Sequence, residues 1–301
     1  MYDPILVALD GSRRAEHVLP HAADLSRTFG GRVILLQVIE PPNTAFGSSL
    51  DPDRYTSMEH ARVSRYLARQ VVQLQERGAT ALTEVAHGVP SEIIVQRAAE
   101  IGTGLIAIST RGRGGLGRLI FGSVATVVAR SAACPVFVIR PTIRGGGDLG
   151  SPRQILAVVA GGDAANAGGP GHAAVFTSRY GATLTLLRTT VSVAALRAGS
   201  GPGGHPRELV ARARLDAAIE VAELAQDLRG RGLDVIGEAP SGDVAPVTLG
   251  RARELRAELI VVGLRAKAAS PRKLLDAPRA RCSSPTPLFT GRCHGVAKGT
   301  H

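Results

Sequence analysis

Short apolar runs alternate with longer amphipathic segments through the first half of the chain. The runs are continuous and rich in Val, Ile and Leu, as expected of strands that are buried on both faces of a parallel sheet. Strict alternation of strand and helix predicts right-handed crossovers and a doubly wound sheet with helices on both faces. The expected strands are residues 5–9, 33–39, 81–86, 105–108 and 136–139, and the expected helices are 15–29, 54–77, 92–101 and 116–131.

The same pattern restarts in the second half. Residues 155–159 resemble the first strand, the string GATLTLL parallels the earlier GGRVILL, and residues 259–262 form an apolar run before another loop. A chain of 301 residues is long enough for two domains of ordinary size. The sequence therefore predicts two tandem, doubly wound, Rossmann-like α/β domains. Their expected bounds are 1–141 and 153–290, with a glycine-rich linker at 142–152 and a tail at 291–301.

The end of the chain departs from this repeat. From Pro278 onward, no apolar run corresponds to the strand at 136–139. We therefore expect the last strand of the second sheet to be lost, short or irregular. Residues after Thr290 are expected to be poorly ordered, because little of that segment can be buried.

The composition argues against several kinds of function. The net charge of +11 comes mainly from arginines that are scattered along the expected helices, and aromatic residues are only 3%, so nucleic-acid binding is not expected. Three distant cysteines suit neither a disulfide framework nor a paired-cysteine zinc site. His17 and His21 lie four residues apart on one expected helix but lack a third ligand, so no metal site is expected. No apolar run reaches the roughly 18 residues of a membrane helix, and we expect a cytoplasmic protein.

Two polar segments follow strands of the first expected sheet. Asp10, Gly11 and Ser12 come directly after the first strand and supply a carboxylate, a turn glycine and a helix cap. The string STRGRGGLGR follows the fourth strand, and a glycine and a serine open the next helix. Glycines let a backbone approach a phosphate, and the amides at a helix start donate to it. In a doubly wound sheet, such segments meet where the strand order reverses, so we expect an anion-binding crevice with a carboxylate on one side.

The first half resembles the universal stress protein family. The strings ILVALDGS, GGRVILLQVIE and STRGRGGLGRLIFGSVATVVARSAACPVFVIR are similar to that family's signature blocks and stand in the usual order. Members that bind ATP use a glycine, two residues, a second glycine, nine residues, and then a glycine followed by Ser or Thr. Gly112 matches the second glycine, Gly122 and Ser123 match the final pair, and Ser109 replaces the first glycine.

This resemblance implies an ATP site in the first domain, with or without Mg²⁺. It places Asp10 near the adenosine, Val38 in the adenine slot and the matching glycines at the phosphates. The expected ligand-contacting residues are Ala8, Leu9, Asp10, Gly11, Ser12, Val38, Ser109, Arg111, Gly112, Arg113, Gly122, Ser123 and Val124. The resemblance also implies pairing of the two domains within one chain, or a homodimer, either of which would cover the edge of each last strand.

The second half differs where ligand chemistry is expected. Ala160 stands in the place of the Asp10 carboxylate and Gly162 in the place of Ser12. At the four positions of the glycine motif stand Gly263, Ala266, Asp276 and Ala277. A carboxylate where phosphate-binding amides are expected repels a phosphate. We therefore expect the second domain not to bind ATP in the manner of the family.

These features favour binding over catalysis. The sequence has neither the Lys-Ser/Thr pair of a P-loop nor a kinase-like set of residues, so no catalytic residue is assigned. The expected function is that of an ATP-binding regulatory protein of the stress response, with at most weak ATP hydrolysis. Two alternatives stay open, a ligand-free interaction scaffold and a slow ATPase.

Overall fold

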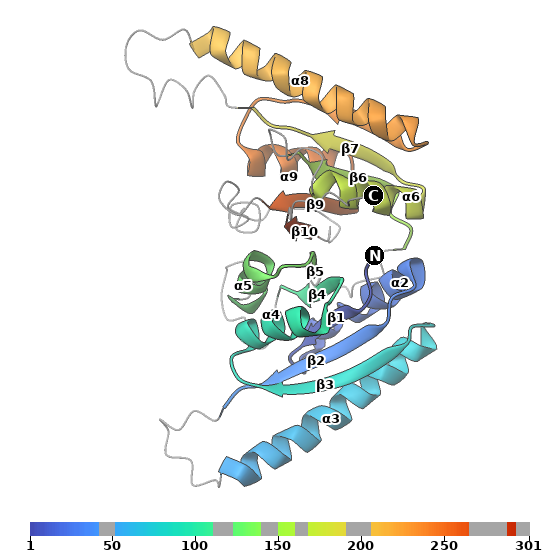
Figure 1. The fold of residues 1–301 in the computed structure, drawn as a ribbon, viewed down its shortest axis with the longest axis vertical. Coiled ribbons are helices and arrows are strands. Elements are labelled where there is room, and N and C mark those ends of the chain that lie inside the picture. Colours follow the sequence, from blue (N-terminus) through green and yellow to red (C-terminus); the bar gives the residue numbers. More distant parts are fainter. Residues whose placement is uncertain are drawn as a thin grey trace, which may run out of the picture. The chain divides into compact units, whose positions relative to one another are not determined.

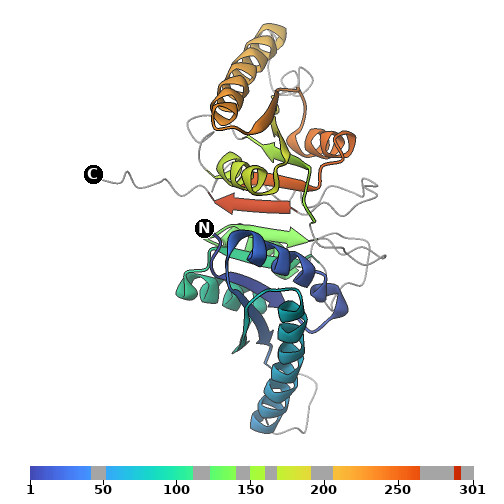
Figure 2. The same cartoon turned by 90° about the vertical axis from the view of Figure 1, so that its right-hand side faces the viewer.

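The computed structural model divides the chain into two units, Met1–Gly150 and Ser151–His301. It describes residues 1–41, 52–110, 123–139, 150–159, 168–190, 206–264 and 288–292. Each unit is built around a parallel sheet with helices on its faces (Figures 1 and 2), which confirms the predicted fold class. Most of the expected linker at 142–152 lies outside the described residues, so its bounds stay a prediction.

The first unit has five strands in the order β3-β2-β1-β4-β5, and the neighbouring strands are parallel. Helices α2 and α3 pack together over one face, while α4 and α5 pack together over the other (Figure 1). The strands are β1 (Ile5–Leu9), β2 (Val33–Ile39), β3 (Ala81–His87), β4 (Leu105–Ser109) and β5 (Val136–Ile139). The helices are α1 (Arg13–Glu16), α2 (Leu19–Phe29), α3 (Pro52–Glu76), α4 (Pro90–Ile101) and α5 (Ser123–Ser131).

The strand order reverses between β1 and β4. The chain moves outward from β1 to β3 and then crosses back to β4 on the far side of β1. All five residues of β1 and all five of β4 are buried, because these central strands are covered on both faces. The carboxyl ends of β1 and β4 therefore lie side by side at the point where doubly wound sheets bind ligands.

The start of the chain packs closely on the first unit. Tyr2 is buried and meets Phe29 edge-on, with ring centroids 4.8 Å apart. A Cβ atom built on Gly31 would lie only 2.2 Å from the carbonyl oxygen of Tyr2. This close backbone approach requires glycine at position 31.

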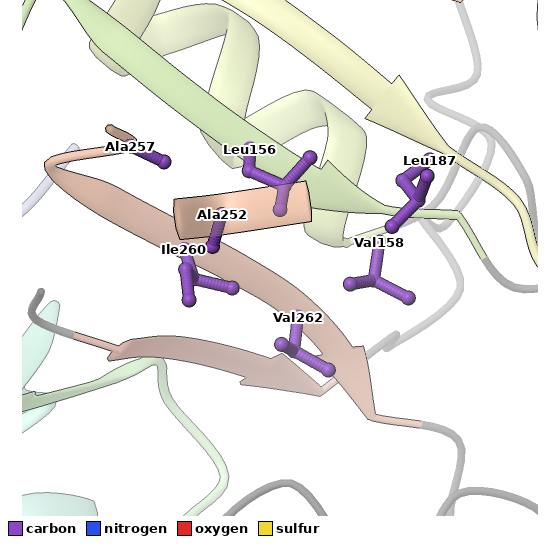
Figure 3. Close-up of a cluster of buried hydrophobic side chains, with 7 residues drawn as sticks. All are labelled: Leu156, Val158, Leu187, Ala252, Ala257, Ile260 and Val262. Carbon is purple, nitrogen blue, oxygen red and sulfur yellow. The ribbon is translucent and has the colours of Figure 1, made fainter. Parts of the chain in front are cut away.

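The second unit has the same topology. Its strands lie in the order β10-β9-β6-β7-β8 and are parallel to their neighbours. A cluster of buried aliphatic side chains fills its core (Figure 3). The elements are β6 (Gln154–Val158), α6 (Gly169–Tyr180), β7 (Thr183–Leu187), α8 (Pro206–Gly230), β8 (Asp234–Glu238), α9 (Val244–Glu254), β9 (Leu259–Leu264) and β10 (Leu288–Arg292).

Strand β10 rules out one of the three alternatives expected for the end of the second sheet. The closing strand of the second sheet is not lost: it pairs with β9 from Leu288 opposite Ile260 to Arg292 opposite Leu264. Parallel pairing is made by backbone groups, so it does not need the long apolar run that was missing from the sequence. The strand also crosses the expected end of the second domain at residue 290.

An ion-pair arrangement recurs in both units. Arg97 on α4 binds Glu84 on β3 and Glu100 on its own helix. Arg251 on α9 binds Glu238 on β8 with nitrogen–oxygen distances of 2.5 and 2.6 Å, and it also binds Glu254 at 2.6 Å. In each unit the arginine follows the strand glutamate by 13 residues and precedes the helix glutamate by three. The same contact therefore ties the edge strand to the following helix in both units.

Candidate functional site

A tight turn fixes the carboxylate that follows β1. Gly11 has a φ of +77°, a conformation that side-chain-bearing residues rarely adopt. The turn lets the Ser12 amide donate to Oδ1 of Asp10 at 2.9 Å. Oγ of Ser12 accepts from the Ala15 amide at 3.2 Å, which confirms Ser12 as the N-cap of α1. The half-buried Asp10 carboxylate is thus held in one orientation at the carboxyl edge of the sheet.

Ser109 lies at the end of the neighbouring strand β4. Its side chain is buried, and Oγ donates to the backbone carbonyl of Arg14 at 3.1 Å. Arg14 belongs to α1, the short helix that begins directly after the Asp10 turn. The end of β4 and the Asp10 turn are therefore connected through α1.

The strand register separates the predicted residues into two faces. Leu9 pairs with Gln37 of β2, so Asp10, the next residue, falls beside Val38. Because side chains alternate along a strand, Ala8, Asp10 and Val38 share one face, while Leu9 and Gln37 point to the other. Ala8 and Leu9 are both buried, and Val38 is half-buried.

Thr110 is a further polar residue at this edge that the sequence analysis did not single out. Ala8 pairs with Ile108, so Thr110 falls on the same face as Asp10, and its amide continues the ladder by donating to the Ile139 carbonyl at 2.8 Å. Its Oγ1 is buried, and within the described ranges it has no hydrogen-bond partner. The two-residue period of the strand could have found it only together with the pairing of β4 and β1.

The predicted phosphate loop is described only at its ends. Arg111, Gly112, Arg113 and Gly122 lie outside the described residues. Ser123 is exposed and begins α5, and Val124 is half-buried. The first amides of a helix lack intrahelical partners and carry the positive end of its dipole, so this helix start can accept an anion.

The two histidines of the first helical segment do not share a helix. His17 caps the C-terminus of α1, and His21 lies in α2, which starts at Leu19 with Pro20 in its first turn. His21 is buried and tilted against Phe137, with ring centroids 6.0 Å apart. In the described part of the chain, no group of three His, Cys, Asp or Glu side chains could hold a metal ion.

Burial suppresses the reactivity of the one cysteine in the described ranges. It raises the pKa of the Cys134 thiol to about 11, because the thiolate is poorly solvated there. The thiol is therefore protonated near neutral pH and is a poor nucleophile. Among the described residues, no helix is long and apolar enough to cross a membrane.

The second unit differs at the corresponding edge. The pairing of Val158 with Val262 makes Gly263 the counterpart of Ser109. A Cβ atom built on Gly169, at the start of α6, would lie 2.7 Å from the Gly263 amide nitrogen, so backbone packs directly on backbone. Ala160, Gly162, Ala266, Asp276 and Ala277 lie outside the described residues, so the predicted loss of this site is not tested by the structure.

Arg188 marks a second difference between the two edges. It follows β7 at the place that Gln37 takes in β2, and its guanidinium lies 2.8 Å from Glu220 of α8. In the first unit, this position holds the neutral side chain of Gln37, which is 4% exposed. The second unit therefore carries an ion pair where the first has a buried neutral amide.

Comparison with known proteins agrees with this architecture. Residues 1–140 match the model of the universal stress protein family. Over 141 residues, the chain is 30% identical to a universal stress protein from the QAH/OAS sulfhydrylase 3′ region of Thermus aquaticus, covering 46% of this chain and 100% of that one. The chain belongs to the universal stress protein family. A universal stress protein of Methanocaldococcus jannaschii is 28% identical over 141 residues, which are 46% of this chain and 83% of the relative.

The solved structure of a universal stress protein from Archaeoglobus fulgidus extends the likeness to both units. It covers 97% of each chain with a TM-score of 0.71 at 18% sequence identity. At this identity the likeness shows the fold alone. The likeness in fold therefore extends over both units, while the sequence match lies in the first unit.

Proposed function

We propose that this universal stress protein binds an adenine nucleotide, ATP being the expected ligand, in its first unit and acts as a nucleotide-dependent regulator in the stress response. The observation that carries the proposal is the Asp10 carboxylate, which the Ser12 amide holds at 2.9 Å beside the point where the strand order reverses. A fixed carboxylate can accept from an adenine amino group or a ribose hydroxyl. The start of α5 offers amides to the phosphates.

The proposal assigns the two units different tasks. The shared topology and the recurring arginine–glutamate contact support an origin by tandem duplication. The sequence of the second unit lacks the carboxylate of the first, having Ala160 in its place. The second unit then serves as an interface, paired either with the first unit or with a second copy of the chain, and the expected place of action is the cytoplasm.

The experiment is a nucleotide assay on the full-length protein. Protein purified without added nucleotide is denatured and its released bases are separated by chromatography, and the emptied protein is titrated with ATP by calorimetry. Loss of a hydrogen bond to a charged group is expected to make Asp10→Ala bind ATP about 10- to 100-fold more weakly. Gly122→Asp places a negative charge at the phosphates and is expected to weaken binding strongly.

The matched control is Ala160→Ser, which changes the equivalent position of the second unit and is expected to leave ATP binding unchanged. Equal loss in this control would contradict the division of tasks. Absence of bound nucleotide, together with no ATP affinity below the millimolar range, would favour the ligand-free scaffold. One observation keeps the scaffold as the second candidate. Ser109 stands where ATP-binding relatives have glycine, and its hydroxyl is bound to a backbone carbonyl.

A further inference from the structure

The hydroxyl of Ser109 is directed to a helix rather than to the expected ligand. We propose that Ser109 is a positioning residue: by binding the Arg14 carbonyl, it holds α1, and with it the Asp10 turn, in the orientation that receives the nucleotide. The effect on the nucleotide rests on the proposed function. The link itself belongs to the ligand-free protein and can be tested without any nucleotide.

The length of α1 explains why such a link matters. A helix of four residues cannot pair most of its own carbonyls, because the last four carbonyls of any helix lack intrahelical partners. The Arg14 carbonyl receives its donor from Oγ of Ser109, 95 residues further along the chain. Without this bond, a buried donor on β4 and a helix-end carbonyl would each lose a partner.

The contacts at the start of α1 transmit the position of the helix to Asp10. Oγ of Ser12 caps the helix, and the Ser12 amide is bound to the Asp10 carboxylate. A second, longer contact holds the other end, where Nε2 of the buried Gln70 lies 3.5 Å from Oε1 of Glu16. A shift of α1 therefore moves Ser12, and Ser12 is the group that orients the carboxylate.

The register argues that Ser109 acts through α1 and not on the ligand. Ser109 follows Ile108, which pairs with Ala8, so it shares a face with Leu9 and not with Asp10. Its hydroxyl is bound to α1, on the face opposite to the one that Asp10 and Val38 share. Because Oγ donates its proton to the Arg14 carbonyl, it could meet a ribose hydroxyl only as an acceptor.

In the second unit, a helix that corresponds to α2 rather than α1 packs on the equivalent strand position. Gly263 takes the place of Ser109, and the start of α6 packs against it so closely that a Cβ atom on Gly169 would be only 2.7 Å from its amide nitrogen. Such an approach leaves no room for a side chain at the contact. In the first unit a hydroxyl spans the distance between strand and helix, and in the second the two backbones touch.

The first test is amide hydrogen exchange of the full-length protein without nucleotide, read by mass spectrometry at short labelling times. In Ser109→Ala, the peptide that spans Asp10 to His17 is expected to exchange about five-fold faster, as the loss of one hydrogen bond allows. Ser109→Thr retains the hydroxyl and is expected to restore the slower exchange. Thr103→Val is the control, because it removes a buried hydroxyl at the opposite end of β4 that has no partner among the described residues. Unchanged exchange of this peptide in Ser109→Ala would overturn the proposal.

The second test separates positioning from contact. Ser109→Ala and the unmodified protein are titrated with ATP, 2′-deoxy-ATP and 3′-deoxy-ATP. If Ser109 positions the Asp10 turn, the variant binds all three about five-fold more weakly. If the hydroxyl touches the ribose, the loss disappears with one deoxy analogue, and the positioning role is wrong. If the unmodified protein binds none of the three, the proposed function fails, while the exchange experiment still decides whether Ser109 holds α1.

Discussion

Acidification is expected to destabilise the second unit through one histidine. His172 lies in the first turns of α6, and burial lowers the pKa of its imidazole from 6.5 to about 4, because the imidazolium would be poorly solvated. The folded state then stays neutral at a pH where the unfolded state binds a proton. The free energy of unfolding is highest above pH 6.5 and decreases as the pH drops below this value. The decrease is complete near pH 4. Integration of the two titrations gives a loss of about 2 kcal/mol between about pH 8 and about pH 5.

The assay is hydrogen exchange of second-unit peptides at the two pH values, corrected for intrinsic exchange rates and converted to free energies of opening. His172→Gln removes the titrating group and is expected to remove most of the loss. His87→Gln changes an exposed histidine of the first unit and serves as the control, which should keep the loss in the second unit. If His172→Gln loses as much stability on acidification as the unmodified protein, burial of His172 is not the cause.

Three further outcomes follow from contacts in the structure. Arg97→Gln and Arg251→Gln each remove the equivalent ion pairs of one unit, so each is expected to lower the urea concentration at which its own unit opens, as followed by hydrogen exchange. An effect in only one unit would show that the two contacts are not equivalent. With the other two cysteines replaced by serine, Cys134 should react with iodoacetamide about 100-fold more slowly than an unburied thiol, and rapid alkylation would contradict the raised pKa. In Gly171→Ala, the added Cβ atom meets no atom of another described segment within 4 Å, so the free energy of unfolding is expected to rise by about 0.5–1 kcal/mol. In Gly31→Ala, the close approach of Tyr2 should lower the free energy of unfolding by more than that. Thermal unfolding measures both variants, and a Gly31→Ala protein as stable as the unmodified one would show that the close approach is unimportant.

The strands could be predicted from sequence more accurately than the helix starts. Continuous apolar runs located β1, β2, β4 and β5 well, because buried parallel strands have a strong hydrophobic signal. The single helix expected at 15–29 is broken, since Pro20 lies in the first turn of α2. Helix α4 begins at Pro90 with Val89 as its N-cap, before the expected start at residue 92, and the proline at the first helical position was the missed signal.

The site was predictable only where it is local in the sequence. The Asp10 turn and the Ser12 cap involve residues within three positions of one another, so turn chemistry was enough to anticipate them. The bond from Ser109 to Arg14 joins residues 95 positions apart and depends on which strands are neighbours. Thr110 was missed for a related reason, since its face is set by the register of β4 against β1 and not by any motif.

The ion pair between Arg188 and Glu220 has a consequence for how the chain folds. Two units of the same topology in one chain can exchange equivalent strands during folding, and such exchange is a characteristic error of repeat proteins. If β7 alone took the place of β2, Arg188 would enter a position where Gln37 is 4% exposed and would lose Glu220 as its partner. An unpaired buried charge costs several kcal/mol, so the wrong assembly is penalised more than the correct one, in which the charge is paired. The ion pair is thus expected to favour the assembly in which β7 stays in its own unit.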